Sequence, residues 1–386
     1  MAEPVRIPAE AGDKFRRSTG MGRGRMAGSD TDSLGMKILL LPTGPWGPTW
    51  RAFMPGREPD PLRIFDLLAG QGLRTKLIDP HAWPWNPFGG RRTLYEGLDP
   101  LRTLGVLLRE RDCDAVLTWS EAPALALLLL RRLFRFKPAI IAVDIGIIEW
   151  KVIRRMHDFI VPRLDAIFVL GTNQIEYINT HWKTNAIVEF VPQHVDTDFY
   201  RPAPDQPDGP VLSVGDDAGR DFDTLLKALE GIAAPVVIKS RYDNFDRTKY
   251  PNVELVPQRL PGVEFRRLYE RSCFVVVPLV PMVKAGGIST LLEAMAMGKA
   301  LIVSDSPGIR DYAIPDETCL LVPCGDAAAL REAILRLLRE PDTRARLAAN
   351  ARRFVEQNCS HPVHAAKLGE AIRRVVHAKR RRAGEP

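Results

Sequence analysis

The sequence predicts an α/β protein with two Rossmann-like, doubly wound domains that face a central cleft. Short, near-continuous apolar runs alternate with helical patterns along most of the chain, which is typical of parallel sheets covered by helices on both faces. Residues 191–210 are rich in Pro and Asp and have no periodic pattern, so we expect a linker there. The 386 residues are enough for about two domains.

We expect the first domain at residues 36–190. Apolar runs that end at turn signals predict its strands, at Lys37–Leu41, Thr75–Ile78, Ala115–Trp119, Ala139–Asp144, Ala166–Leu170 and Ile187–Phe190. Helical patterns between them predict helices at Leu62–Gly70, Asp99–Arg109 and Ala122–Phe134. Residues 1–35 have no apolar segment of the kind that a signal peptide needs, so we expect a disordered extension there and a cytoplasmic protein.

The second domain is expected at residues 211–358, with the same alternation. Strands are predicted at Val211–Val214, Val236–Lys239, Val253–Leu255, Phe274–Pro278, Leu301–Ser304 and Cys319–Val322. Helices are predicted from near Ser289 and at Asp221–Leu229, Val263–Arg271, Ala327–Leu338 and Pro341–Asn358. Residues 359–386 hold a predicted C-terminal helix, which we expect to cross back to the first domain, and a basic tail.

Composition and net charge limit the classes of partner that the protein is expected to bind. The net charge of +7 and the pI near 9.2 favour anionic partners, such as nucleotide phosphates or an acidic membrane surface. No zinc-finger, RNA-recognition or basic-zipper pattern occurs, so we do not expect a nucleic acid partner. The five cysteines are scattered and have no histidines at ligand spacing, so we expect a reducing compartment and no metal site.

The most informative segment is PLVPMVKAGGISTLLEAMAMGKALIVSD, at residues 278–305. It follows an apolar strand, contains a glycine loop, enters a helix and ends in another strand. Gly286 and Gly287 let the backbone approach a ligand closely. Ser289 or Thr290 would cap the helix, whose free N–H groups attract an anion. The alternative is an ordinary turn between a strand and a helix.

Two charged residues of this segment favour a ligand. Glu293 is surrounded by Leu291, Leu292, Ala294 and Met295, and a carboxylate among apolar residues usually has a specific partner. Ribose hydroxyls would serve, whereas the alternative is a solvated helix residue. Lys284 is expected at the mouth of the loop, where it would neutralise a diphosphate or simply be exposed.

Several segments resemble the retaining glycosyltransferases of the family 4 type, also called glycosyl transferases group 1, which have the GT-B fold. They are DAIFVLGTNQ at 165–174, VPQHVDTDFYRP at 191–202, VLSVGDDAGRDFDTLLKAL at 211–229 and residues 278–305. The resemblance implies that a sugar moves from a nucleotide-sugar donor to an acceptor with retention, without a metal or other cofactor. It covers the second half best, and the first half only in outline.

The resemblance also implies residue roles. The family carries two glutamates eight positions apart, and Glu293 matches the second, which binds the donor ribose. The first falls on Ala285, which has no carboxylate. The family's second loop glycine falls on Ile288, and Gly287 lies one position early. These departures leave the donor sugar, and transfer itself, open.

A second part of the predicted donor site follows the strand Val211–Val214, in the sequence VGDDAGRDF that begins with Val214 and Gly215. Relatives use an Arg and a Lys here to hold the diphosphate. Arg220 matches the Lys position, and its forked guanidinium suits phosphate. The Arg position falls near Asp216, and Lys239 at the end of the next strand would compensate. The alternative for Arg220 is an ion pair with Asp221 or Asp223.

The first domain offers fewer candidates. Gly44 and Gly47 follow the first strand, in a loop that relatives place near the donor diphosphate. Asp144 ends the fourth predicted strand, where many relatives have a histidine, and either Asp144 or Glu149 would act there or cap a helix. Asp144, Arg220 and Lys284 are therefore the candidate catalytic residues. His194 in the linker is expected to be structural.

Other interpretations stay open at this point. A nucleotide-sugar epimerase would use the same fold, and a catalytically degenerate transferase would serve as a binding or scaffold protein. Residues Leu129–Lys137, LLRRLFRFK, alternate basic and large apolar side chains. They predict either a buried helix with a basic end or a patch that rests on an anionic membrane, with the basic tail at residues 379–382 assisting.

Overall fold

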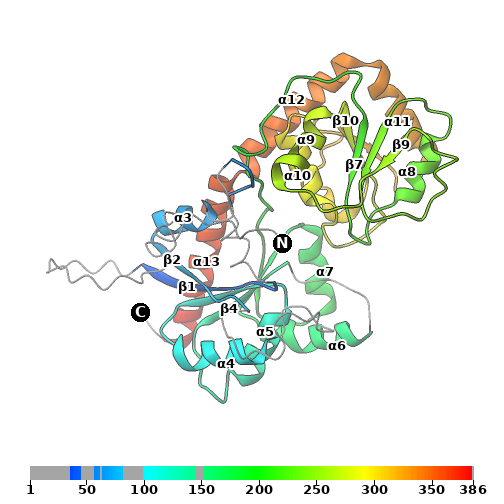
Figure 1. Ribbon diagram of the computed structural model, residues 1–386. Helices are drawn as coiled ribbons and strands as arrows, with labels where there is room; N and C mark the ends of the chain where they lie inside the picture. The colour runs from blue at the N-terminus through cyan, green and yellow to red at the C-terminus, as the bar shows by residue number, and fades with distance from the viewer. Residues whose placement is uncertain (1–34, 45–55, 61–62, 81–98, 145–150, 385–386) are drawn as a thin grey trace, which may run out of the picture.

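The computed structural model describes residues 35–44, 56–60, 63–80, 99–144 and 151–384. It contains two sheets of six strands each, and every pairing of strands within them is parallel. Each sheet is covered by helices on both faces, as the alternation of apolar runs and helices predicts (Figure 1). The two-domain α/β fold is thereby confirmed.

The first sheet has the strand order β2-β1-β3-β4-β5-β6. Its strands are β1 (Met36–Leu41), β2 (Leu73–Leu77), β3 (Ala115–Trp119), β4 (Ala139–Val143), β5 (Ala166–Val169) and β6 (Ile187–Phe190). The described helices are α3 (Arg63–Gly70), α4 (Pro100–Arg109), α5 (Ala122–Leu130), α6 (Lys151–Ile160), the short η1 (Val161–Arg163) and α7 (Asn173–His181). Alternate residues of one strand serve opposite cores: Ile38 packs in the core shared with α3, whereas Leu39 packs in the core shared with α4 and α5.

The second sheet has the order β12-β11-β10-β7-β8-β9. Its strands are β7 (Val211–Val214), β8 (Val236–Lys239), β9 (Val253–Leu255), β10 (Phe274–Val277), β11 (Leu301–Ser304) and β12 (Leu320–Val322). Its helices are α8 (Phe222–Leu229), α9 (Gly262–Arg271), α10 (Ile288–Ala296), η2 (Pro307–Ile309), α11 (Ala327–Arg339) and α12 (Pro341–Asn358). The strand order reverses between β7 and β10, and doubly wound sheets bind ligands where the order reverses.

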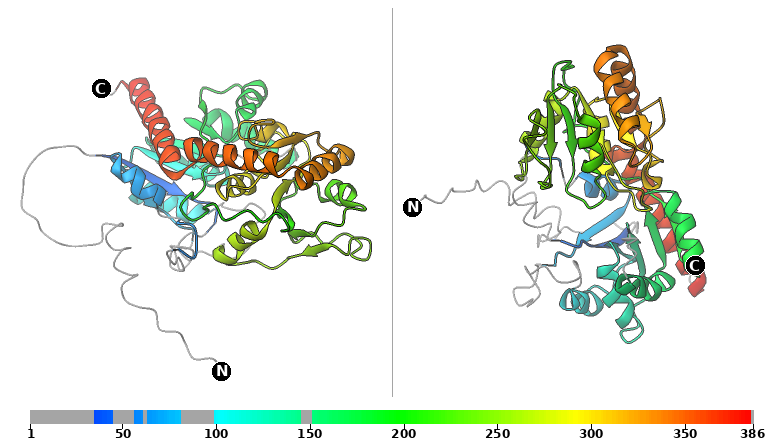
Figure 2. Two further views of the ribbon diagram at one scale, coloured as in Figure 1. Left: turned by 90° about the horizontal axis from the view of Figure 1, so that it is seen from above. Right: turned by 90° about the vertical axis from the view of Figure 1, so that its right-hand side faces the viewer.

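The C-terminal helix α13 (His361–Ala383) leaves the second domain and packs on the first (Figures 1 and 2). Ala365, Leu368 and Ile372 lie in one core with Leu40 and Leu68. The predicted crossing back of this helix is confirmed. Because the linker also joins the domains, two chain segments connect them. They pair at one point, where Val195 donates its backbone N–H to Cys359.

One predicted helix end is wrong. We expected helix from Ala122 to Phe134, but α5 ends at Leu130 and residues 131–135 form turns. Arg135 has the left-handed φ of +49°, which reverses the chain and lets Phe136 return to the core. The segment is therefore not one long buried helix.

Within the described part of the chain, no helix combines the length and the apolar character that crossing a membrane would require.

Candidate functional site

The loops after β7 and β10 lie against each other at the carboxyl end of the second sheet. Arg220 and Leu279 form an isolated antiparallel bridge. On either side of it, Asp221 donates its backbone N–H to Pro278, and Val280 donates to Gly219. The position where the strand order reverses is thus built from two hydrogen-bonded loops, one with Arg220 and the other with the glycines before α10.

The Arg220 guanidinium lies between these loops and is almost completely buried, with 4% of its side chain exposed. Its Nε donates to Asp217 Oδ2 at 2.9 Å, and its Nη2 donates to Thr290 Oγ1 at 2.9 Å. The third nitrogen, Nη1, is buried and has no hydrogen-bond partner among the described residues. A buried, unpaired donor on a cation is costly unless an anion binds it. The ion pair of Arg220 is with Asp217, and not with Asp221 or Asp223.

Glycines make room for this arginine. A Cβ at Gly215 would lie 2.0 Å from Arg220 Nε, and a Cβ at Gly287 would lie 3.1 Å from Nη1. Any larger residue at Gly215 would displace the guanidinium. The structure therefore brings Gly215, Arg220 and Gly287 together, as the predicted donor site requires.

The start of α10 differs from the predicted cap. Gly287 is the N-cap, with a left-handed φ of +76°, and no side chain caps the helix. Glycine adopts this conformation readily, so the helix begins at Ile288, which is buried, and before Ser289, which is exposed. Thr290 instead accepts from Arg220 and donates to Val214 O at 3.3 Å. The first backbone N–H groups of α10 therefore lie beside the buried guanidinium of Arg220. No side chain among the described residues caps them.

The side chain of Met282 covers the two loops that surround Arg220, which we call the Arg220 cradle. Its Cε lies 2.2 Å from where a Cβ of Gly219 would stand, and its Sδ lies 2.4 Å from where a Cβ of Gly286 would stand. The thioether therefore rests directly on the backbone of both loops, and we expect a phosphate bound between them to displace it. Methionine is flexible and gives way at a small cost.

We expect Met282→Ala to tighten the binding of nucleoside diphosphates, because the ligand no longer has to displace the thioether. The gain is limited to the contacts that the side chain loses, and it corresponds to about tenfold in Kd at most. Calorimetric titration of both proteins measures it, with Val283→Ala as the control in the same loop. Weaker binding by Met282→Ala would show that the thioether is part of the site.

Glu293 faces two tyrosines. Tyr200, from the linker, donates to Glu293 Oε1 at 3.3 Å, and Tyr269, from α9, donates to Oε2 at 2.7 Å. Burial raises the pKa of Glu293 to about 7, although both hydroxyls and Arg220 counteract the rise. Two tyrosines of the chain itself are therefore the partners of this carboxylate, and a ribose as a further partner stays a prediction. Each oxygen keeps acceptor capacity for a ribose hydroxyl.

The raised pKa of Glu293 predicts a pH effect on stability. The unfolded carboxyl ionises near 4.5 and the folded one near 7, so the folded state holds the extra proton in this window. The free energy of unfolding should therefore fall as pH rises from 5 to 8, by up to about 3 kcal/mol from this group. Glu293→Gln removes that loss.

Urea denaturation at pH 5 and pH 8 checks this expectation. The stability difference between Glu293→Gln and the wild type should shift in favour of the variant at the higher pH. Glu264→Gln, at an exposed position of α9, is the control and should show no such shift. A stability difference that stays the same at both pH values would mean that the carboxyl is ionised throughout this range and that its pKa is not raised.

Asp144 and Lys284 meet across the two domains. Lys284 Nζ, on the loop before α10, lies 3.5 Å from Asp144 Oδ2 at the end of β4. Asp144 has a left-handed φ of +50°, and its other oxygen, Oδ1, is buried without a partner among the described residues. Burial raises the pKa of Asp144, and the Lys284 charge partly opposes the rise. Strained backbone with a buried, unpaired carboxylate oxygen is typical of functional sites.

The other predicted residues that the structure describes lie at the ends of strands, after them or in the linker. Lys239 ends β8, and its backbone oxygen accepts from Gly215. Gly44 follows β1, whereas Gly47 and Glu149 lie outside the described residues. His194 is partly buried, with its ring centroid 4.9 Å from His361 and 4.4 Å from His364.

Ala285, where the resemblance predicts the family's first glutamate, is buried in the second domain's core. The backbone of η2 approaches closely here, since a Cβ at Gly308 would lie 2.2 Å from Lys284 O. Among the described residues no group of three or more His, Cys, Asp or Glu is arranged to hold a metal ion.

Sequence reasoning missed four contributors to this site. Asp217 pairs with Arg220, Met282 covers the cradle, and Tyr200 and Tyr269 hold Glu293. Asp217 stands three residues before Arg220, a spacing at which it could have been weighed with Asp221 and Asp223. The tyrosines come from distant segments and gave no local signal.

The comparisons with solved structures decide the fold. Sucrose-phosphate synthase from Thermosynechococcus elongatus matches with a TM-score of 0.71 at 20% identity, over 89% of this chain and 100% of that one. A glycosyltransferase from Rickettsia africae matches with a TM-score of 0.64 at 13% identity, over 89% and 99%. HepE from Anabaena, in complex with UDP, matches with a TM-score of 0.62 at 12% identity, over 88% and 100%. The chain has the GT-B fold.

The sequence comparison is more local. The family Glycosyl transferases group 1 matches residues 251–354. This range includes the loop before α10, the whole of α10 and Glu293. The chain therefore carries a glycosyltransferase group 1 domain in its second half. No curated protein sequence matches the chain.

Proposed function

We propose that this GT-B protein transfers a glycosyl group from a nucleoside-diphosphate sugar to an acceptor. The observation that carries the proposal is Arg220 Nη1, a buried cationic donor at the start of α10. Neither this donor nor the start of the helix has a side-chain partner within the described segments. A diphosphate would satisfy both the guanidinium and the free N–H groups of the helix. HepE was solved with UDP and with UDP-glucose, which supports a nucleoside-diphosphate sugar as the donor.

The site's own groups suit the chemistry of this transfer. Negative charge develops on the departing diphosphate, and Arg220, Lys284 and the first amides of α10 would stabilise it. Because these groups neutralise the charge, the proposal needs no metal, and we expect turnover to persist in a chelator. Glu293 would accept from the donor ribose between its two tyrosines. The resemblance to retaining relatives supports retention of the anomeric configuration.

The acceptor belongs on the first domain. Asp144 approaches the second domain through Lys284, and its buried Oδ1 would accept from a hydroxyl of a substrate. Closure of the cleft would exclude water and limit hydrolysis of the donor. The proposal therefore assigns donor binding to the second domain and the first contact with the acceptor to Asp144.

One specific observation favours a second candidate, a nucleotide-binding protein without transfer. By the resemblance Ala285 replaces the family's first glutamate, and its side chain is buried in the core of the second domain, where a carboxylate would be desolvated. Such a protein would keep the Arg220 cradle and bind the nucleotide sugar without consuming it.

Incubation with a panel of uridine, guanosine, adenosine and thymidine diphosphate sugars tests the proposal. We expect free nucleoside diphosphate to appear with one donor, only when a pool of acceptors is added, and to be lost in Asp144→Asn. An isomerised donor without any acceptor would instead indicate an epimerase. Binding of a donor that no acceptor pool consumes would favour the second candidate.

A further inference from the structure

Four large apolar side chains are exposed among the described residues, and all four lie on α4, on α5 or in the turn after α5. They are Leu104, Leu108, Leu129 and Leu133, with 36%, 55%, 58% and 76% of their surfaces exposed. Leu104 and Leu108 are four residues apart in α4, which places both on one side of that helix. Leu129 lies at the end of α5, and Leu133 lies in the turn that follows it. Single exposed leucines are ordinary, but such a gathering marks an interaction surface.

The two helices are neighbours on the first sheet (Figure 1). Val106 and Leu107 of α4 share a core with Leu127 and Leu128 of α5. Beyond the helices, Arg111 donates to Phe134 O and ties the two segments together. We name the surface formed by the four leucines with Arg132 and Arg135 the α4–α5 face. The second domain packs elsewhere, because it contacts the first sheet's α7 and the end of β4.

The charge around the α4–α5 face is positive. From Ala122 to Pro138 the chain has four cations and no acidic residue. Arg132 and Arg135 are exposed and form no ion pair with any described residue. Nearby acids are mostly engaged, since Glu110 pairs with Lys37 and Lys76 and Asp114 pairs with Arg380; Asp112 is the exposed exception.

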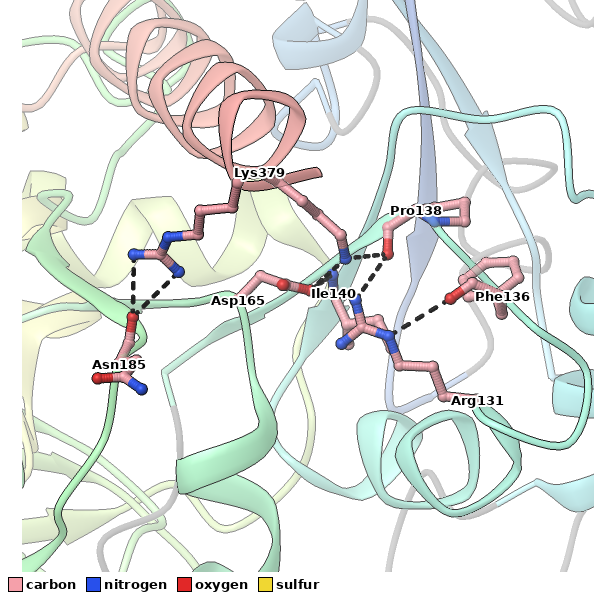
Figure 3. Close-up of polar contacts among 8 residues, drawn as sticks. Arg131, Phe136, Pro138, Ile140, Asp165, Asn185 and Lys379 are labelled. Atoms are coloured by element: carbon pink, nitrogen blue, oxygen red, sulfur yellow. Dashed lines mark hydrogen bonds and ion pairs between the residues drawn. The ribbon is translucent and has the colours of Figure 1, made fainter. Parts of the chain in front are cut away.

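Hydrogen bonds hold the residues on either side of the turn that carries Leu133 and Arg135, as Figure 3 shows for Arg131, Phe136 and Pro138. Asp165 Oδ2 accepts from Arg131 Nη2 at 3.0 Å, from Ile140 N at 2.8 Å and from Lys379 Nζ at 2.8 Å. Lys379 also donates to Pro138 O at 2.8 Å. Leu133 and Arg135 are therefore presented outward on an ordered support. Lys379 and Arg380 of the tail are used by the fold itself, which corrects our expectation that the tail assists at this surface.

We propose that the α4–α5 face docks on an anionic membrane surface. Leucines that enter the interface beside arginines that reach lipid phosphates are the composition such surfaces use. A second copy of the chain fits less well. In a two-fold symmetric dimer centred on this face, Arg132 and Arg135 would face the same arginines of the partner, and like charges repel.

Vesicle co-sedimentation of the full chain tests the docking without any donor or acceptor, so its outcome is independent of the proposed function. We expect binding to phosphatidylcholine vesicles that contain phosphatidylglycerol, little binding to phosphatidylcholine alone, and weaker binding at high salt. Leu129→Ser with Leu133→Ser, and separately Arg132→Glu with Arg135→Glu, should each lower the partition coefficient by about tenfold or more.

The matched control is Arg346→Glu with Arg353→Glu, which makes the same charge change on exposed positions of α12 and should retain binding. The proposal is overturned if the wild type ignores anionic vesicles or if the control loses as much binding as the arginine pair on the face. It is also overturned if the leucine variant turns a dimer into a monomer in sedimentation velocity, because a second copy then occupies the face. Circular dichroism confirms that each variant is folded.

Discussion

Arg220→Ala should lose most of the affinity for nucleoside diphosphates. The guanidinium is a buried cation between the two glycine-containing loops, and its Nη1 has no partner in the part of the chain that the structure describes. Hydrogen bonds between charged groups contribute about 1.5–3 kcal/mol, so the Kd should rise by roughly 10- to 150-fold. Affinity for the matching nucleoside, which has no phosphates, should change little. Calorimetric titration with both ligands measures the difference.

Two variants make this result specific. Arg220→Lys keeps the charge but not the fork, so we expect an intermediate loss. Arg241→Ala removes an exposed arginine beside Asp216 and should leave binding as in the wild type. If Arg220→Ala weakens the nucleoside and the diphosphate equally, the guanidinium supports the fold of the site and does not contact phosphate.

Asp144→Asn should reduce turnover far more than donor affinity. The substitution keeps the size of the side chain and removes the negative charge that faces Lys284. Groups that transfer or hold a proton in the transition state contribute about 10²- to 10⁴-fold, so we expect kcat to fall by at least about 10²-fold. KM for the donor should change by much less. Initial rates at varied donor concentration separate the two.

The pH profile distinguishes a direct role from a structural one. Burial raises the pKa of Asp144, so the wild type should lose activity as pH falls through that raised pKa and the carboxylate becomes protonated. Asp144→Asn should lack this acidic limb. Asp305→Asn, at a carboxylate that pairs with Arg310 after β11, is the control and should keep the limb. An unchanged kcat in Asp144→Asn would remove this residue from the mechanism.

The fold was predictable because its strands are short apolar runs with clear ends. Strands such as Ala115–Trp119 and Val211–Val214 have the bounds that their apolar runs predict, because buried parallel strands need continuous apolar residues. The end of α5 was not predictable. Arg135 adopts a left-handed conformation there, and the turn depends on the burial of Phe136 and on contacts from Asp165 and the distant α13.

The site was predictable as far as strand ends determine it. Topology alone brings the ends of β7 and β10 together, so Arg220 and Gly287 could be expected to meet. The contact of Lys284 with Asp144 is different, because it depends on how the two domains sit against each other. Tyr200 and Tyr269 were missed because they come from segments distant in the sequence, one from the linker and the other from α9. Met282 was missed because loop conformation alone brings it over the cradle.

The account's central claim is that the second domain binds the diphosphate of a nucleotide sugar. Titration of the wild-type protein with uridine, guanosine, adenosine and thymidine diphosphates, and with the corresponding nucleosides, tests it most directly. We predict that at least one diphosphate binds, and that its nucleoside binds at least about tenfold more weakly. The claim is contradicted if none of the diphosphates binds, or if each nucleoside binds as tightly as its diphosphate.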